Sequence, residues 1–321
     1  MTTTALDPHE TRQATTPAER LRQVAAAVRV SFVWMGVRKT LTPEQKTQAA
    51  ESFGADGDSL TACKKLLDTT HPAFKAVTAV RGRAVSYWKS KTLPYPEPGI
   101  RLIRQDDIDT FNQEMATHRA DLEVKVTTLD DHYSELKTAA RRLLGHLHDP
   151  SDYPPSLRGL FALAWEFPNV QPPEYLLQLN PAIFEQEKAR AISRFEEAVR
   201  LGEQAFISEF AELVSHLCER LSTDATGEKK VFRDTVVTNL GGFFDRFRHL
   251  NIHSSAQLDE LVEQAQRLVR GVEPQALRTN DGLRQQIATQ FSGVQARLDG
   301  MLVDRPSRTI IRSRRSEGGN S

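Results

Sequence analysis

The chain has 321 residues, of which 39% are hydrophobic and 26% are charged. This composition is typical of an ordinary globular protein, and it excludes a chain that is disordered throughout or built of membrane spans. Forty-two Lys and Arg residues balance 42 Asp and Glu residues. No net charge therefore steers the whole molecule toward nucleic acid or membrane, and any such contact must come from a local cluster.

The N-terminal residues and the cysteines indicate the cellular compartment. Residues 1–17 are polar and rich in threonine, without the apolar core of a signal peptide. Cys63 and Cys218 lie far apart and outside any CxxC pattern. We therefore expect a disordered leader at 1–17 and two reduced thiols in a cytoplasmic protein.

Residues 18–103 carry helix signals that are interrupted by breaks. Apolar and polar residues alternate over 28–34, which fits a strand as well as a helix, so we allow a minor β element there. Thr42 followed by Pro43 is typical of a helix start, and another helix follows Pro72. Three prolines in 94–98 predict an extended connector, because proline is not tolerated inside a helix.

The segment 104–148 predicts one long coiled-coil helix. It contains no proline, and its only glycine is Gly145. Apolar residues recur at alternating steps of three and four, with one additional four-residue step between Leu122 and Val126. This spacing is that of a coiled-coil seam with one stutter, and at 1.5 Å per residue the helix would be about 65 Å long.

A second long helix is predicted over 181–221, where Asn180 and Pro181 form a start signal. Two long helices, each with one apolar stripe, pack most economically antiparallel, which would place Leu122 against Phe206. The proline-rich connector at 149–180 would then form the tip of this hairpin. Its aromatic residues are candidates for contact with a partner protein: Phe161, Trp165 and Phe167.

The last third of the sequence predicts three more helices, over 229–249, 256–271 and 283–303. Residues 304–321 form a predicted disordered basic tail. The expected fold is mainly α, an elongated helical bundle with a long antiparallel coiled-coil hairpin and at most a minor β element. Its helical base comprises 18–103 and 222–303, and its hairpin comprises 104–148 and 181–221.

No catalytic motif occurs in the chain. The sequence lacks GxxxxGK[ST], HExxH and GxSxG, and it has no GxGxxG after a strand. His146 and His148 would point apart on a helix, and Asp130-Asp131-His132 is interpreted as a charged helix flank. Glu166 is either a buried acid or, as we favour, an outward-facing residue of an alternating strand. We therefore expect a protein that is not an enzyme, with no catalytic residue, cofactor or metal.

Charge is segregated along the sequence. Residues 64–104 carry a net charge of +7, and residues 105–135 carry −7. Aromatic residues interleave with the basic block, as in proteins that bind single-stranded nucleic acid. One interpretation is therefore nucleic-acid contact through Arg81, Arg83, Trp88, Lys89 and Lys91. The other interpretation, which we favour, is that the basic block neutralises the acidic block within the same molecule.

Several segments resemble a family of bacterial and phage proteins known as a domain of unknown function. They are Trp34-Met35-Gly36-Val37-Arg38-Lys39, residues 92–101, Leu179-Asn180-Pro181 and Val303-Asp304-Arg305-Pro306. Members look like companions of MoxR-type AAA+ ATPases and von Willebrand factor A-type proteins in mobile elements, and the resemblance transfers no active site. It implies a non-enzymatic adaptor or scaffold. The alternatives are a nucleic-acid-binding accessory protein of a phage or mobile element and, third, a hydrolase without a known motif.

Overall fold

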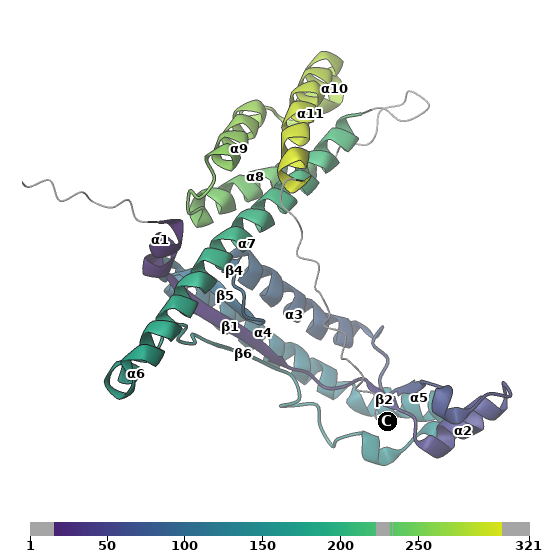
Figure 1. The fold of residues 1–321 in the computed structure, drawn as a ribbon. Coiled ribbons are helices and arrows are strands. Elements are labelled where there is room, and N and C mark those ends of the chain that lie inside the picture. The colour runs from purple at the N-terminus through teal and green to yellow at the C-terminus, as the bar shows by residue number, and fades with distance from the viewer. Residues whose placement is uncertain (1–15, 223–231, 233, 304–321) are drawn as a thin grey trace, which may run out of the picture. The chain divides into compact units, whose positions relative to one another are not determined.

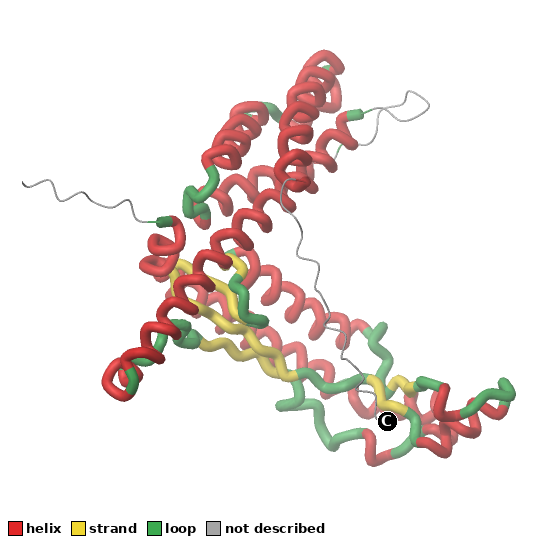
Figure 2. Tube along the Cα trace, in the orientation of Figure 1, coloured by secondary structure: helices red, strands yellow, loops and turns green. Residues whose placement is uncertain are grey.

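The computed structural model describes residues 16–222, 232 and 234–303 (Figure 1). The described chain is mainly α-helical with a small antiparallel sheet, which confirms the predicted class and its minor β element (Figure 2). None of the helices in this part of the chain is long and apolar enough to cross a membrane. The chain divides into two compact units, an N-terminal unit at 1–198 and a C-terminal unit at 199–321.

The two predicted disordered ends fall mostly outside the described residues, which exclude 1–15 and 304–321. Thr16 and Pro17, expected in the leader, instead begin helix α1 (Pro17–Val24). The Thr16 hydroxyl accepts the backbone N–H of Glu19, and the Glu19 carboxylate accepts the backbone N–H of Thr16. This capping box satisfies two N–H groups that a helix start otherwise leaves unpaired, and it fixes the start of α1 at Pro17.

A four-stranded antiparallel sheet organises the N-terminal unit, with strand order β4-β5-β1-β6. Its strands are β1 (Ala25–Val33), β4 (Thr92–Pro94), β5 (Ile100–Arg104) and β6 (Ala162–Glu166). The alternation at 28–34 therefore belongs largely to a strand, β1, which lies between β5 and β6. Pro94 ends the edge strand β4, a position where the missing N–H is tolerated.

Five further helices and a second, two-stranded sheet complete the N-terminal unit. The strands are β2 (Arg38–Thr40) and β3 (Cys63–Lys65), which pair antiparallel. The helices are α2 (Pro43–Glu51), α3 (Pro72–Ser90), α4 (Ile108–Asp131), α5 (Tyr133–Leu144) and α6 (Tyr175–Leu179). Short 3₁₀ turns lie at Gly57–Ser59, Gln105–Asp107, Gly145–Leu147 and Pro150–Asp152. The predicted starts of α2 and α3 are confirmed, and Thr42 caps α2 in a second capping box.

The predicted helix at 104–148 is split at His132 into α4 and α5. Its apolar stripe is buried, but in one cluster with strand β1 and helix α3, which runs beside α4 (Figure 1). From α4 and α5 this cluster includes Phe111, Met115, Leu122, Val126, Leu129, Tyr133 and Leu136. The coiled-coil hairpin with 181–221 is not confirmed. The stripe established that the helix has a buried face, and this face is covered by α3 and the sheet.

The connector at 149–180 supplies strand β6 to the sheet rather than forming only a link between two helices. Arg29 and Glu166 are opposite each other in the β1–β6 register. Leu157, Phe161 and Leu163 of this segment are buried in the same cluster as α3 and α4. The proline-rich segment is therefore folded, because its apolar residues complete the core of the N-terminal unit.

A buried ion pair links β3 to the turn at Pro150–Asp152. Nζ of Lys64 lies 2.6 Å from Oδ2 of Asp152, and the two side chains are 5% and 0% exposed. Nζ also donates to the carbonyl oxygen of Leu147 at 2.7 Å. The more exposed Lys39 of β2 forms a second ion pair with Asp152. The small sheet is thus held to the segment after α5 by charge as well as by packing.

Helix α7 (Pro181–Leu221) spans both units, and its residues from Val199 onward belong to the C-terminal unit. The other helices there are α8 (Asp234–Leu250), α9 (Ala256–Val269), α10 (Pro274–Thr279) and α11 (Asp281–Val303). Phe206, predicted opposite Leu122, instead has its ring 5.0 Å from that of Phe247. Phe210 stacks on Phe243 at the same distance.

The buried Arg284 of α11 closes the C-terminal end of α7. Its Nε donates to the carbonyl oxygen of Leu221 at 2.9 Å, and Nη2 donates to that of Arg220 at 2.6 Å. The last carbonyls of a helix have no partner within the helix, and a cation there also complements the helix dipole. Arg284 therefore satisfies polar groups that would otherwise be buried without partners.

Candidate protein-binding surface

The three aromatic residues predicted to contact a partner have different surroundings. Phe161 is 5% exposed and belongs to the core, with its ring 4.9 Å from that of Trp34. Trp165 is half-buried, and its Nε1 donates to Oδ1 of Asn112 at 2.7 Å. Phe167, directly after β6, is exposed. Of the three, only Phe167 is exposed, and about two fifths of its surface is open to a partner.

Glu166 occupies the outer face of β6. Its side chain is exposed, and Oε1 lies 3.0 Å from Nη1 of Arg29 on the neighbouring strand. Phe161 and Leu163, which alternate with the outward-facing positions, are buried. The arrangement agrees with the outward-facing interpretation, since the carboxylate is exposed and paired with Arg29 rather than buried.

The basic residues of α3 are largely engaged within the molecule. The guanidinium of Arg81 lies 4.9 Å from the ring centre of Trp34, a cation–π distance. Arg83 forms an ion pair with Asp121 of α4. Lys89 is exposed, and Lys91 is the half-exposed residue that ends the helix. The Arg83–Asp121 pair supports the interpretation that the basic block neutralises the acidic block.

Trp88, the predicted base-stacking residue, faces the interior. It is half-buried against the core cluster, and its Nε1 is buried without a hydrogen-bond partner among the described residues. The guanidinium of Arg101 lies 6.0 Å from its ring centre. An indole whose polar atom is buried and whose ring packs on the core presents little free face for a base.

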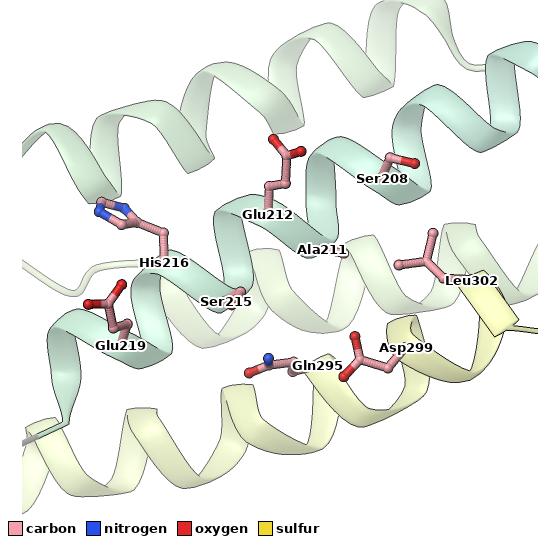
Figure 3. Close-up of a pocket in the computed structure, with 9 residues that line it drawn as sticks. All are labelled: Ser208, Ala211, Glu212, Ser215, His216, Glu219, Gln295, Asp299 and Leu302. Carbon is pink, nitrogen blue, oxygen red and sulfur yellow. The ribbon is translucent and has the colours of Figure 1, made fainter.

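A groove of about 550 Å³ lies within the C-terminal unit (Figure 3). Glu212, His216 and Glu219 line it from α7, and Gln295 and Asp299 line it from α11. Its other lining residues are Ser208, Ala211, Ser215 and Leu302. Seven of these nine lining residues are polar, and three of the seven are acidic.

Several exposed apolar residues lie close together at the junction of α6 and α7. Tyr175, Leu177, Leu179 and Ile183 are 59%, 51%, 76% and 44% exposed. They fall within nine consecutive residues. We call these four residues the junction surface. Scattered exposed apolar residues are normal, but such a concentration is typical of a site that binds another protein.

The local sequence fixes the conformation of the junction. The backbone N–H of Asn180 donates to the carbonyl oxygen of Leu176, which closes α6. Oδ1 of Asn180 accepts the backbone N–H of Ile183 at 3.2 Å, and Pro181 begins α7. Asparagine is a strong helix cap, and proline is preorganised for the first helical position. The chain therefore turns sharply here and still presents side chains from ordered helices.

Residues further along α7 anchor this segment to the N-terminal unit. The ring of Phe195 lies 5.8 Å from that of Tyr95, and Nη1 of Arg194 lies 2.6 Å from Oε1 of Glu97. Ala191, Phe195 and Ala198 are buried, in contrast to the junction surface. The predicted partner contact lies at the aromatic residues before this segment. The sequence signal for the junction surface is the apolar run Tyr175-Leu176-Leu177, which precedes the cap at Asn180.

No family model, curated protein or solved structure matches this chain.

Proposed function

We propose that this protein is a non-enzymatic adaptor or scaffold that binds a partner protein through the junction surface. The exposure of four large apolar side chains within nine residues is the observation that carries the proposal. Burying such side chains in a partner stabilises a complex by about 25 cal/mol per Å² of apolar surface, less the entropy lost on association. The occupant we propose is a folded domain with an apolar groove that accepts one or two helical turns.

The first partners to test come from the resemblance to the bacterial and phage family. They are a MoxR-type AAA+ ATPase and a von Willebrand factor A-type protein encoded beside this chain, acting with it in the cytoplasm as parts of a mobile element. The absence of catalytic motifs from the sequence supports a role in binding rather than in chemistry. Mixed charges around the junction surface, from Glu174, Glu185 and Lys188, suit the polar rim of an interface.

Replacing Leu177 and Leu179 together with aspartate is expected to weaken partner binding at least tenfold. Two charges would have to be buried against an apolar groove without compensating partners. Stability should hardly change, since both leucines are exposed in the free protein. The measurement is calorimetric titration of the purified ATPase, and separately of the von Willebrand A-type protein, with the wild type and the double variant.

Leu143→Asp provides the matched control, because Leu143 is an equally exposed leucine of the same unit on α5. It should bind the partner as the wild type does. Equal affinity of the double variant and the wild type would refute the junction surface. Self-association of the wild type that the double variant abolishes, with no binding to either protein, would assign the surface to a second copy of this chain and refute the adaptor.

The nucleic-acid alternative rests on the exposed Lys89 and half-exposed Lys91 at the end of α3. The engagement of Arg81 with Trp34 and of Arg83 with Asp121 counts against it. Phosphate contacts release counterions, so binding of this kind would fall steeply with salt. A packed apolar interface depends far less on ionic strength, which allows the two functions to be separated.

A further inference from the structure

Two histidines and a glutamate meet where α3 begins and α4 ends. His71 immediately precedes α3, His132 lies between α4 and α5, and Glu135 is in the first turn of α5. Helices α3 and α4 pack side by side, as the Arg83–Asp121 pair shows, and run in opposite directions. This arrangement brings His71 next to His132 although they are 61 positions apart in the sequence.

The three side chains each offer one ligand atom, and these atoms all lie within 4.8 Å of one another. The rings of His71 and His132 are 5.1 Å apart between centres, and Nδ1 of His132 lies 3.5 Å from Oε2 of Glu135. Zn²⁺ binds imidazole nitrogen and carboxylate oxygen at about 2.0–2.2 Å, which places tetrahedral ligand atoms about 3.3 Å apart. One pair already has about this separation. Small rotations of the exposed His132 and Glu135 side chains would bring their ligand atoms to the half-buried His71.

We propose that His71, His132 and Glu135 form a site for a divalent transition metal, with Zn²⁺ as the ion it takes. Imidazole ligands select zinc and its neighbours over Mg²⁺ and Ca²⁺, which prefer sites made of oxygen atoms alone. Three protein ligands leave a fourth position for water. The bound ion ties the start of α3 to the break between α4 and α5, and thereby holds one end of this helix pair closed.

Metal binding changes one hydrogen bond that the structure shows. Nδ1 of His71 accepts the backbone N–H of Ala73 at 3.3 Å and so caps α3. A metal on Nδ1 would displace this N–H. A metal on Nε2 would require the ring proton to lie on Nδ1, and a protonated Nδ1 could no longer accept the Ala73 N–H. Either way the cap is lost when the ion binds, so the Ala73 amide reports occupancy of the site.

The test is titration of the full-length protein with ZnCl₂, monitored by calorimetry and by the amide resonance of Ala73. We expect one equivalent of Zn²⁺ to bind, with a shift of the Ala73 resonance that saturates at the same stoichiometry. His132→Gln and Glu135→Gln should each reduce the affinity at least tenfold. Both side chains are largely exposed, so circular dichroism should remain that of the wild type. His146→Gln, which changes an exposed histidine on the turn after α5, should bind as the wild type does.

Two results would overturn the site. One is the absence of stoichiometric binding at micromolar Zn²⁺. The other is evidence that the ion is held elsewhere on the surface. Binding that survives in His132→Gln and Glu135→Gln would show this, and so would binding that leaves the Ala73 amide resonance unchanged. MgCl₂ at the same concentrations should give no response, and a response equal to that of zinc would refute the choice of ion.

Discussion

Asp152→Asn is expected to destabilise the N-terminal unit by about 3–5 kcal/mol, the usual cost of removing one partner of a buried ion pair. The Asp152 side chain is fully buried, and its Oδ2 lies 2.6 Å from Nζ of Lys64. Asparagine keeps the shape of the side chain but not its charge. The ammonium of Lys64 would then remain buried with the Leu147 carbonyl as its main partner.

Urea unfolding of the full chain measures this effect as a change in midpoint at constant slope. Lys39→Met is the control, because Lys39 is the exposed partner of the same carboxylate, and its substitution should shift the midpoint far less than Asp152→Asn does. If the two substitutions lowered the free energy of unfolding equally, the burial of the Lys64–Asp152 pair would add nothing to stability.

The same ion pair predicts how acid acts on the N-terminal unit. Burial alone would raise the pKa of Asp152, but the hydrogen bonds and charges of Lys39 and Lys64 outweigh burial and lower it. A carboxyl whose folded pKa lies below the unfolded value, about 3.9, contributes stability above that pH and loses it as the pH falls through the folded pKa. The stability difference between wild type and Asp152→Asn should therefore shrink below about pH 4 in urea titrations.

Helix starts were the features that the sequence predicted best. Thr42 with Pro43 and Asn180 with Pro181 mark the observed starts of α2 and α7. Capping depends on a side chain and a backbone N–H two or three residues away, so its signal is local and can be recognised without the rest of the fold. The alternation at 28–34 is equally local, but it fitted a helix as well as a strand, and the pairing of β1 with β5 and β6 decides for the strand.

The choice of partner for each apolar face could not be predicted in this way. The stripe from Phe111 to Leu129 fits a coiled coil as well as a helix packed on α3 and a sheet, because both bury one face. The pairing of Val30 with Trp165 joins strands separated by more than 130 residues, and no local pattern specifies it. The chain divides between residues 198 and 199, and not into a base and a hairpin. This division follows from the long-range contacts.

The candidate sites also depend on long-range contacts that no local sequence pattern specifies. Leu177 and Leu179 look like core residues in the sequence, but the described part of the folded chain leaves both exposed. Phe161 shows the opposite difference, since it was a candidate for contact with a partner and is buried in the core. His132 was interpreted as part of a charged flank because its neighbours in sequence point away from it. Its partner for a metal site, His71, comes from another helix.

Trp88→Ala is expected to destabilise the N-terminal unit by about 3 kcal/mol, the lower end of the range for removing a large aromatic side chain, because the ring is only half-buried. The indole packs on the core cluster, and its removal leaves a cavity beside Arg101, whose guanidinium lies over the ring. If bases instead stacked on Trp88, the substitution would leave stability nearly unchanged and weaken single-strand binding by about 1–3 kcal/mol.

Urea unfolding and a titration with labelled single-stranded DNA and RNA at two salt concentrations distinguish these outcomes. Lys89→Glu with Lys91→Glu is the companion variant, since both side chains can change without disturbing the core. We expect a clear loss of stability in Trp88→Ala, an unchanged fold in the lysine variant, and no salt-sensitive binding by the wild type. The opposite outcome is tight binding by the wild type that falls steeply with salt and that both variants lose while remaining folded. Phosphate contacts would explain the loss in the lysine variant, and base stacking would explain the loss in Trp88→Ala. That result would replace the adaptor by a nucleic-acid-binding accessory protein.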